Sequence, residues 1–391
     1  MEGRETRVLY DIVVIGGGPV GSYTAGRLAA LGYKTIVIEE HSKSGEAICC
    51  TGIIGKECVD RFPVDRSVIL NESRSAKFFA PSGKFLRMEK PSTQAYIVDR
   101  PAFDAAMAME ARKQGAEYKY NTRVRHLTVR QDLVSVEVEN SSKNIETRAT
   151  IIACGFHSHL CRRMGLGKLD NFAAGAQADV DTEVDEVEVY FGRARAPKFF
   201  SWLVPTSPGK GLAGLLSYHK PSPILREFLS HLHTQGKIDT PDVNIRYGGV
   251  PLKPLSRTYR ERILVVGDAA GQVKPTTGGG VYYGLLSANK AVETMSTALS
   301  LNDFSTSVLS QYEIGWKGAL NRELRLDRWA RWLFEQLSDR RMERVFETVE
   351  SRDIHNSLME ISDFSFDWHR GLIMKGVRQI GPIGLIQLLR P

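Results

Sequence analysis

Three glycines near the start of the chain have the spacing of a turn that binds a dinucleotide. Gly16, Gly18 and Gly21 form a G-x-G-x-x-G pattern directly after a run of β-forming residues. The first glycine permits a tight turn, the second lets the backbone approach a pyrophosphate, and the third lets the following helix pack closely on the strand. Glu39 ends the next β-forming run, where a carboxylate accepts hydrogen bonds from a ribose 2′-hydroxyl and repels a 2′-phosphate. The pattern therefore predicts a dinucleotide site.

A second group of residues is predicted to contact the same ligand from another side. Asp268 follows a glycine at the end of an apolar run, so its carboxylate is expected at the C-terminal end of a strand, where ligands bind in open α/β sheets. There it can accept hydrogen bonds from a polyol chain. Gly278, Gly279 and Gly280 then open a helix at Val281, whose first N–H groups stabilise negative charge on a flat ring. A reduced flavin carries such charge.

The five cysteines allow two interpretations. They stand at positions 49, 50, 58, 154 and 161, and no two have the C-x-x-C spacing. An odd number of cysteines without a secretory signal indicates a reducing, cytoplasmic setting. Cys154, His157, His159 and Cys161 offer four metal-ligand types, but their loop is short and a nucleotide-binding turn explains the same segment better. We therefore expect no metal there.

Strands and helices in alternating order are expected to bring these residues together. The spacing of apolar residues predicts strands over 12–15, 35–38, 124–138, 150–153 and 263–266, and helices over 22–31, 101–114 and 281–299. This alternation is typical of an α/β fold around a parallel sheet, in which the glycine turn joins the first strand to the first helix.

An inserted segment has a different character. Apolar and polar residues alternate over 184–191 and 201–204, and prolines and glycines punctuate 171–250, as in an antiparallel sheet. From residue 311 onward the pattern is helical. We predict a discontinuous nucleotide-binding domain made of residues 1–60, 96–170 and 255–300. An inserted antiparallel-sheet domain is expected over residues 61–95 and 171–254, and a C-terminal helical region over residues 301–391.

Composition limits the class of protein. The chain has 391 residues, of which 42% are hydrophobic and 25% charged, as is typical of a globular protein with a sizeable core. Its net charge of +7 is compatible with an anionic membrane surface or an acidic protein partner. We expect no nucleic-acid partner, because the basic residues form no stripe with interleaved aromatic residues. We also expect no signal peptide and no membrane-spanning segment.

Several motifs together resemble known flavoproteins. The glycine pattern with Glu39, the pair Asp99-Arg100 before a helix, and the run from Gly267 to Gly271 resemble the signature segments of the aromatic-hydroxylase type. Within that group, the chain is similar to the archaeal digeranylgeranylglycerophospholipid reductase-like branch of the geranylgeranyl reductase family. The segments that carry this similarity are 267–280, Cys50-Thr51-Gly52, and 200–205 followed by Gly209, Gly211 and Gly214. The resemblance covers about residues 8–300.

The resemblance implies a fold and a set of contacts. The fold is a Rossmann-like FAD-binding domain of the p-hydroxybenzoate hydroxylase type with an inserted antiparallel sheet. The implied FAD contacts are Gly16, Gly18, Pro19, Gly21, Glu39, Glu40, Cys50, Gly52, Arg100, Val124, Gly155, Asp268, Gly278, Gly279, Gly280 and Val281. The implied substrate contacts are Phe200, Trp202, Pro205, Gly211 and Tyr282. The chain departs from the family pattern where Phe200 replaces a tyrosine, Val204 a phenylalanine, and Cys154 an aspartate.

The resemblance also implies an activity, the saturation of isolated C=C bonds in geranylgeranyl chains, here of archaeal-type membrane ether lipid precursors. An unactivated alkene is a poor hydride acceptor, so the reaction needs a strong donor, exclusion of water and a proton for the second carbon. Cys50 is the candidate catalytic residue, because a thiol near a flavin can donate a proton or hold the substrate in place. A structural role for that cysteine is equally open. Tyr282 and Tyr283 are further candidates.

The electron donor and the location stay open. No second strand–glycine-turn–helix unit for a nicotinamide is seen, so a ferredoxin, a reduced nicotinamide or a reduced flavin are all compatible. The arginines of 322–344 suit an acidic ferredoxin or anionic lipid, or form a solvated face whose charge nearby acidic residues offset. The apolar stretch 372–389 suits a cover for the substrate tunnel or a membrane contact. A cytoplasmic protein, in peripheral contact with the inner face of the membrane, fits these features.

Two other functions share the FAD motifs. A flavin-dependent aromatic monooxygenase has the same glycine and Gly-Asp motifs, but the Cys50-Thr51-Gly52 element and the Trp202 segment disfavour it. A non-catalytic FAD-bound partner protein would bind the cofactor without turnover.

Overall fold

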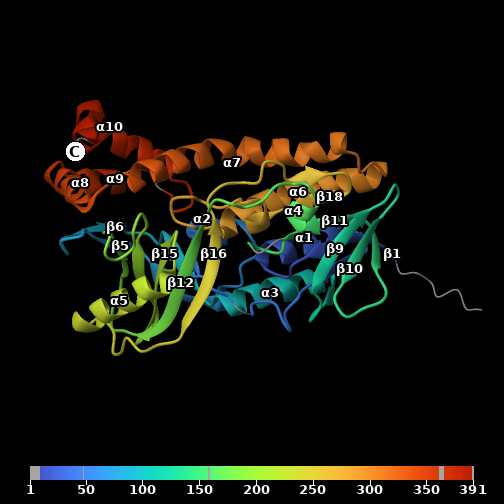
Figure 1. Ribbon diagram of the computed structural model, residues 1–391, viewed down its shortest axis with the longest axis horizontal. Helices are drawn as coiled ribbons and strands as arrows, with labels where there is room; N and C mark the ends of the chain where they lie inside the picture. The colour runs from blue at the N-terminus through green and yellow to red at the C-terminus, as the bar shows by residue number, and fades with distance from the viewer. Residues whose placement is uncertain (1–8, 47, 157–158, 361–364, 390–391) are drawn as a thin grey trace, which may run out of the picture.

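Two large sheets lie at opposite ends of the computed structural model, and the C-terminal helices run along one edge of both (Figure 1). The structure describes residues 9–46, 48–156, 159–360 and 365–389. A long helix, α7 (Thr306–Glu335), spans the distance between the two ends. The α/β fold class that the sequence predicts is confirmed.

The first sheet is built around parallel strands. Its order is β17-β18-β11-β1-β2-β8, and β10 and β9 extend it from β11 as an antiparallel pair. The bounds are β1 (Leu9–Ile15), β2 (Thr35–Ile38), β8 (Glu117–Lys119), β9 (Val124–Val129), β10 (Val134–Val138), β11 (Ile145–Ile152), β17 (Tyr259–Arg260) and β18 (Ile263–Val265). Because β1 lies between β11 and β2, both parallel to it, its C-terminal glycine turn comes to the middle of the sheet edge.

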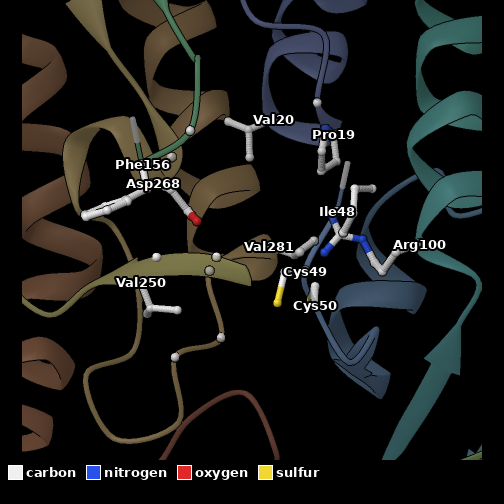
Figure 2. Close-up of a pocket in the computed structure, with 18 of the residues that line it drawn as sticks. Pro19, Val20, Ile48, Cys49, Cys50, Arg100, Phe156, Val250, Asp268 and Val281 are labelled. Carbon is white, nitrogen blue, oxygen red and sulfur yellow. The ribbon is translucent and has the colours of Figure 1, made fainter. Parts of the chain in front are cut away.

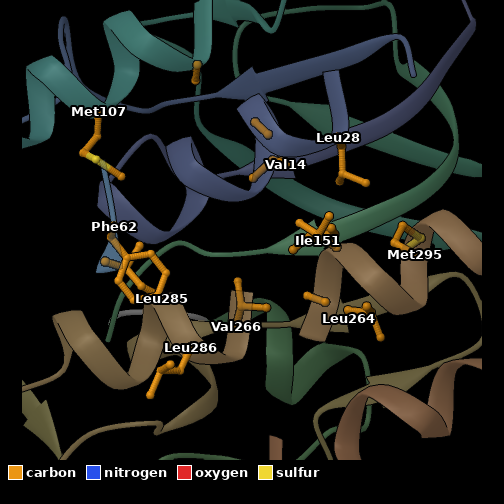
Figure 3. Close-up of a cluster of buried hydrophobic side chains, with 14 of the residues drawn as sticks. Val14, Leu28, Phe62, Met107, Ile151, Leu264, Val266, Leu285, Leu286 and Met295 are labelled. Carbon is orange, nitrogen blue, oxygen red and sulfur yellow. The ribbon is translucent and has the colours of Figure 1, made fainter. Parts of the chain in front are cut away.

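Helices cover one apolar face of this sheet. They include α1 (Pro19–Ala30), α3 (Arg100–Lys113) and α6 (Val281–Leu301). Buried side chains such as Val14, Ile151 and Leu264 from the strands meet Leu28 of α1 and Met295 of α6 (Figure 3). Removing such aliphatic residues from water is the main favourable contribution to folding, so this core fixes the strand ends that carry the site.

The second sheet has seven strands in the order β16-β12-β15-β14-β13-β5-β6. The bounds are β5 (Ser75–Phe79), β6 (Phe85–Glu89), β12 (Phe172–Asp181), β13 (Val187–Tyr190), β14 (Ser201–Ser207), β15 (Lys210–Ser217) and β16 (Ile245–Pro251). Helix α5 (Pro221–Thr234) packs on one face. One pair departs from the antiparallel prediction: β5 runs parallel to β13, because β5 reaches the sheet from a segment about one hundred residues earlier in the chain.

A small sheet and several short elements lie between the two large sheets. The small sheet has the order β3-β7-β4, with bounds β3 (Ile53–Gly55), β4 (Ile69–Ser73) and β7 (Ala95–Val98). Short helices are α2 (Lys56–Arg61), α4 (His159–Arg163), η1 (Arg66–Val68) and η2 (Gly267–Ala270). The sequence analysis did not separate this small sheet from its neighbours, because its strands have only three to five residues each.

The C-terminal helices pack on both ends of the molecule. After α7 come α8 (Asp339–Ser351), α9 (Ile354–Met359) and α10 (Arg370–Leu389), which has a break at Gly381 (φ +72°). Buried Tyr312 donates to the carbonyl of Val265, and buried Trp316 donates to Thr258, so α7 is fixed to the strand that precedes Asp268. At the other end, α9 contacts β6 of the second sheet.

Candidate active site

One cavity of about 1290 Å³ joins the glycine turn of the first sheet to the face of the second. Pockets for a single small ligand typically measure about 300–1000 Å³. This cavity therefore has room for more than one ligand. Most of the predicted site residues contribute to its wall, namely Gly16, Gly18, Pro19, Glu39, Glu40, Cys50, Arg100, Val124, Gly155, Phe200, Trp202, Asp268, Gly278, Gly279, Gly280, Val281 and Tyr282.

The three glycines of the turn have different roles. Gly16 has φ +106°, and a Cβ there would lie 2.5 Å from the carbonyl oxygen of Ala153. A Cβ on Gly21 would lie 2.0 Å from the carbonyl oxygen of Gly16, so this glycine permits α1 to start. Gly18 is different, because a Cβ there would meet no protein atom within 4 Å. The space beside Gly18, at the N-terminus of α1, is therefore open to a pyrophosphate.

Glu39 is held in place by protein donors and keeps capacity for one more. Its Oε2 accepts a hydrogen bond from the N–H of Gly17 at 2.6 Å. Its Oε1 accepts from the N–H of His41 at 3.0 Å and lies 2.7 Å from Nδ1 of the same ring. Since a carboxylate has about four acceptor positions, one on Oε2 is left for a ribose hydroxyl.

Asp268 projects into the cavity from the opposite wall (Figure 2). Within the described residues its carboxylate has no hydrogen-bond partner, although a Cβ on Gly280 would lie 2.4 Å from its Oδ1. Burial raises the pKa of Asp268 to about 6, and the positive charge of Arg100 opposes this shift. Asp268 is half-buried at the cavity wall and its oxygens have acceptor positions to offer, so this carboxylate fits a ligand that brings hydroxyl donors, as the polyol chain of FAD does.

Cys50 lies on the cavity wall beside a charged group. The guanidinium of Arg100 interacts with its sulfur and donates to Oδ1 of buried Asp104 at 3.0 Å. The Sγ of Cys50 accepts from the N–H of Gly52 at 3.5 Å. The preceding residue, Cys49, also faces the cavity, and its pKa is raised to about 11, mainly by burial and then by Cys50. Two thiols in different electrostatic settings thus stand side by side (Figure 2).

The second sheet contributes an apolar chamber. Trp202 and Val204 of β14 and Phe200, directly before that strand, are spaced two residues apart and face the cavity together with Phe191 and, from α7, Phe334. The ring centroids of Phe191 and Phe334 are 5.6 Å apart, and those of Phe200 and Trp202 are 6.0 Å apart. Such a wall suits a hydrocarbon chain and excludes water from it.

Four predicted contacts do not reach the cavity wall. Pro205 and Gly211 pair with each other across β14 and β15. Pro205 follows Val204 in a strand, and successive side chains point to opposite faces. Gly21 and Gly52 lie behind the wall, where a Cβ on Gly52 would be 2.3 Å from the carbonyl oxygen of Val98.

The glycines at 209, 211 and 214 also have the G-x-G-x-x-G spacing, but they lie in and beside the turn between β14 and β15 rather than before a helix. Gly209 has φ +73° at that turn, and a Cβ on Gly214 would lie 2.6 Å from the ring of Trp202. This second set of glycines therefore makes room for an indole and does not form a second dinucleotide turn.

A segment that the sequence analysis missed completes the cavity. Residues 365–370, here called the C-terminal strap, cross the glycine run that precedes α6. The ammonium of buried Lys274 lies 3.6 Å from Oδ1 of buried Asp367 and donates to the carbonyl of Phe366 at 3.2 Å. Burial lowers the pKa of Lys274, and the carboxylate of Asp367 opposes that shift. The Nζ of Lys274 would be 3.7 Å from a Cβ on Gly279.

Further polar contacts fix the strap. Trp368 donates to Glu57 at 2.7 Å, and Nδ1 of His369 lies 2.8 Å from the hydroxyl of Thr276. The same ring nitrogen is 3.5 Å from Oδ1 of Asp327, a fully buried residue whose carboxylate has no hydrogen-bond partner in the described part of the chain. No short motif in the sequence signals this cluster, because its members come from four distant segments.

The alternative metal site is not formed by the residues that the structure describes. In 9–46, 48–156, 159–360 and 365–389, no three His, Cys, Asp or Glu side chains are placed to share an ion. His157 lies outside these residues, whereas Gly155, with φ +67°, lines the cavity beside Cys154.

Relatives with known names place the chain in a family. A family model described as pyridine nucleotide-disulphide oxidoreductase matches residues 10–187. The digeranylgeranylglycerophospholipid reductase of Methanocaldococcus jannaschii is 31% identical and covers 88% of this chain and 92% of its own length. The protein of the same name from Methanococcus vannielii is 28% identical over 87% of this chain and 90% of its own.

Solved structures share the fold. A geranylgeranyl bacteriochlorophyll reductase-like protein from Thermoplasma acidophilum superimposes with a TM-score of 0.85 at 24% identity, covering 97% of this chain and 98% of its own. The halogenase PltM in complex with phloroglucinol and FAD superimposes with a TM-score of 0.68 at 15% identity, covering 96% and 88%. The relatives in sequence, together with a cavity that fits FAD, lead to one conclusion. The chain belongs to the digeranylgeranylglycerophospholipid reductase family and is an FAD-dependent oxidoreductase.

Proposed function

We propose that this protein saturates the isolated C=C bonds of geranylgeranyl chains on an archaeal-type ether lipid precursor. The observation that carries the proposal is the single cavity, which runs from a dinucleotide turn at Gly18 to an apolar chamber at Trp202. A cavity of this size can hold FAD and an isoprenoid chain together. The division into an FAD-binding domain, a substrate domain and a helical region, with the boundaries given above, is part of the same proposal.

The residues at the cofactor end bind and orient. When bound, reduced FAD supplies a hydride. Gly18 leaves space for the pyrophosphate, Glu39 accepts from the ribose, and Asp268 accepts from the polyol chain. The N–H groups at the start of α6, which lies at the cavity wall, would stabilise negative charge on the ring of the reduced cofactor. The remaining predicted cofactor contacts at the wall, such as Arg100 and Val124, shape the space between these groups.

The aromatic chamber positions the alkene and keeps water out. Phe200 and Trp202 lie on one strand face, so they form a continuous apolar surface along which an isoprenoid chain can pack. Tyr282 lines the cavity near the cofactor end, and its hydroxyl donates to Glu57. We assign this tyrosine to shape the cavity rather than to transfer a proton, since burial raises its pKa and its hydrogen is already engaged.

Cys50 is proposed to deliver the proton. Hydride addition to one alkene carbon must be matched by a proton at the other, and the thiol of Cys50 faces the cavity. The neighbouring guanidinium of Arg100 would stabilise the thiolate left behind until solvent returns a proton to Sγ. Burial raises the pKa of the adjacent Cys49 to about 11 although the charge of Arg246 opposes the shift, so we expect Cys49 to stay a thiol.

The two adjacent cysteines provide a matched test of this role. Cys50→Ala should lower the rate of alkene reduction about 10²-fold or more, the usual contribution of general acid catalysis, with FAD retained. Cys49→Ala should have a small effect. Equal effects of the two substitutions, or an unchanged rate for Cys50→Ala, would remove Cys50 from the mechanism.

The direct test of the activity is mass spectrometry of the lipid. The purified protein, reduced anaerobically with dithionite, is incubated with a digeranylgeranyl lipid, and we expect products heavier by about 2 Da per saturated bond. An unchanged lipid, together with oxygen incorporation into an added aromatic compound, would instead establish the monooxygenase. FAD binding without either turnover would indicate a non-catalytic partner protein.

The donor and the location complete the proposal. We propose that electrons come from a separate donor, and a reduced ferredoxin, a reduced nicotinamide and a reduced free flavin can be compared in the same assay. We also propose a cytoplasmic location with peripheral contact at the inner face of the membrane. In the part of the chain that the structure describes, every helix is too short or too polar to cross a bilayer.

A further inference from the structure

The outer surface of α7 carries an exposed stripe of two arginines and two tryptophans. Arg322, Arg325, Trp329 and Trp332 follow one another at intervals of three, four and three residues, which places them on one side of the helix. Trp329 is 39% exposed and Trp332 is 55% exposed. Large aromatic side chains are rarely left in water without a partner, so two of them beside each other mark a contact surface.

The carboxylates of this segment do not offset the charge of the stripe. Glu323 and Asp327 are buried on the inner side of α7. Glu335 is engaged by Arg331 and by the hydroxyl of Tyr218. Within the described residues, neither Arg322 nor Arg325 has a carboxylate partner. The exposed stripe of α7 is therefore positively charged.

The opposite side of the same helix lines the cavity. Ala330 and Phe334 face its apolar end, together with Leu372 and Ile373 from α10, which packs against α7. The next residue of α10, Met374, is 39% exposed. Both helices lie along one edge of the molecule (Figure 1), so the residues of α7 and α10 that line the chamber belong to the layer at that edge.

We propose that this face, made of Arg322, Arg325, Trp329 and Trp332, docks on an anionic lipid membrane. Arginines attract anionic headgroups, and tryptophan side chains favour the boundary between headgroups and hydrocarbon. Docking there brings the membrane to the layer that covers the chamber, so a geranylgeranyl chain can pass between α7 and α10 without crossing water. The inference rests on the proposed function in one respect, because the docking is argued to deliver the lipid substrate. Its test measures vesicle binding and does not depend on that activity.

Vesicle sedimentation tests the docking without turnover. The FAD-loaded wild-type protein should bind vesicles of phosphatidylglycerol and phosphatidylcholine, and bind pure phosphatidylcholine weakly. The double variants Trp329→Ser/Trp332→Ser and Arg322→Gln/Arg325→Gln should each lower binding roughly tenfold or more. Met109→Ser is the matched control, since Met109 is also a large apolar residue, 53% exposed, but lies on α3 rather than on α7. It should bind as the wild type does.

A second assay distinguishes this inference from the proposed function. The tryptophan double variant should reduce the lipid normally in detergent micelles and slowly in anionic vesicles. If the wild type binds vesicles but reduces the lipid in neither form, the proposed function fails and the docking stands. The docking inference would be overturned if the wild type bound no vesicles, if Met109→Ser lost as much binding as the double variants, or if an acidic ferredoxin displaced the vesicles through the same four residues.

Discussion

Two regions form opposite parts of one cavity by different physical means. The glycine turn at residues 16–21 uses backbone N–H groups and the absence of side chains, and its requirements lie within a few neighbouring residues. The C-terminal strap at 365–370 uses buried charges and polar groups, whose partners come from α2, the loop before α6, and α7. The first region can be identified from a short pattern, whereas the second depends on tertiary structure.

Because the two regions are built differently, substitutions in them should have different effects. A side chain added in the glycine turn meets backbone or occupies ligand space, so the loss is steric and local. Removing one partner in the strap leaves a buried charge uncompensated, which costs stability across the elements that it joins. The following substitutions separate these two kinds of failure.

The largest effect is expected in the glycine turn. Gly21→Ala places a Cβ 2.0 Å from the carbonyl oxygen of Gly16, so α1 cannot start as it does, and we expect loss of FAD together with loss of folded protein. The Cβ added by Gly18→Ala meets no protein atom, so this variant should fold. The same Cβ enters the space proposed for the pyrophosphate, so the variant should bind FAD less well. Gly318→Ala, on open helix surface, is the control for both. FAD absorbance and circular dichroism measure the outcome, and a folded, FAD-loaded Gly21→Ala protein would contradict it.

The strap should respond through stability. Lys274→Met leaves Asp367 buried without its cation, and we expect a loss of about 3–5 kcal/mol in the free energy of unfolding. Adding Asp367→Asn should recover part of this loss, because the uncompensated charge is then removed. Denaturant unfolding of the two single variants and the double variant measures the coupling. Strictly additive losses would show that the two groups do not act as a pair.

Strand alternation in the chamber predicts a smaller, selective effect. Trp202→Ala should raise the KM for the lipid about tenfold, since a large apolar contact with the substrate is lost. Pro205→Ala is the comparison on the same strand, and it should leave the KM nearly unchanged because Pro205 does not line the cavity. A larger effect for Pro205→Ala than for Trp202→Ala would mean that the chain lies on the other face of β14.

The smallest effect is a pH dependence of the FAD-free protein. Burial raises the pKa of Asp268 from its ordinary 3.8 to about 6, so ionisation favours the unfolded chain. Relative to Asp268→Asn, the wild type should therefore lose stability as pH rises from 3.8 to about 6 and keep a constant difference above that range. Thermal midpoints of both proteins across this range provide the test. A difference in stability between the two proteins that does not change with pH would contradict the raised pKa of Asp268.

Much of the cofactor end could be predicted from the sequence, since its determinants are local. The strand, the glycine turn and the carboxylates of Glu39 and Asp268 each follow from short-range spacing. The strap could not be predicted, because nothing near Asp367 indicates that Lys274 will be its partner. Pro205 and Gly211 were assigned to the substrate by resemblance, whereas the register of β14 and β15 places them outside the wall.

The central claim is that FAD and an isoprenoid chain occupy the same cavity and react there. The most direct test is a single turnover with dithionite-free, anaerobically reduced protein mixed with a digeranylgeranyl lipid. We predict that the absorbance of oxidised FAD returns while the lipid gains about 2 Da per flavin, and that Cys50→Ala slows both changes together. FAD that stays reduced until oxygen is admitted, with the lipid mass unchanged, would contradict the account.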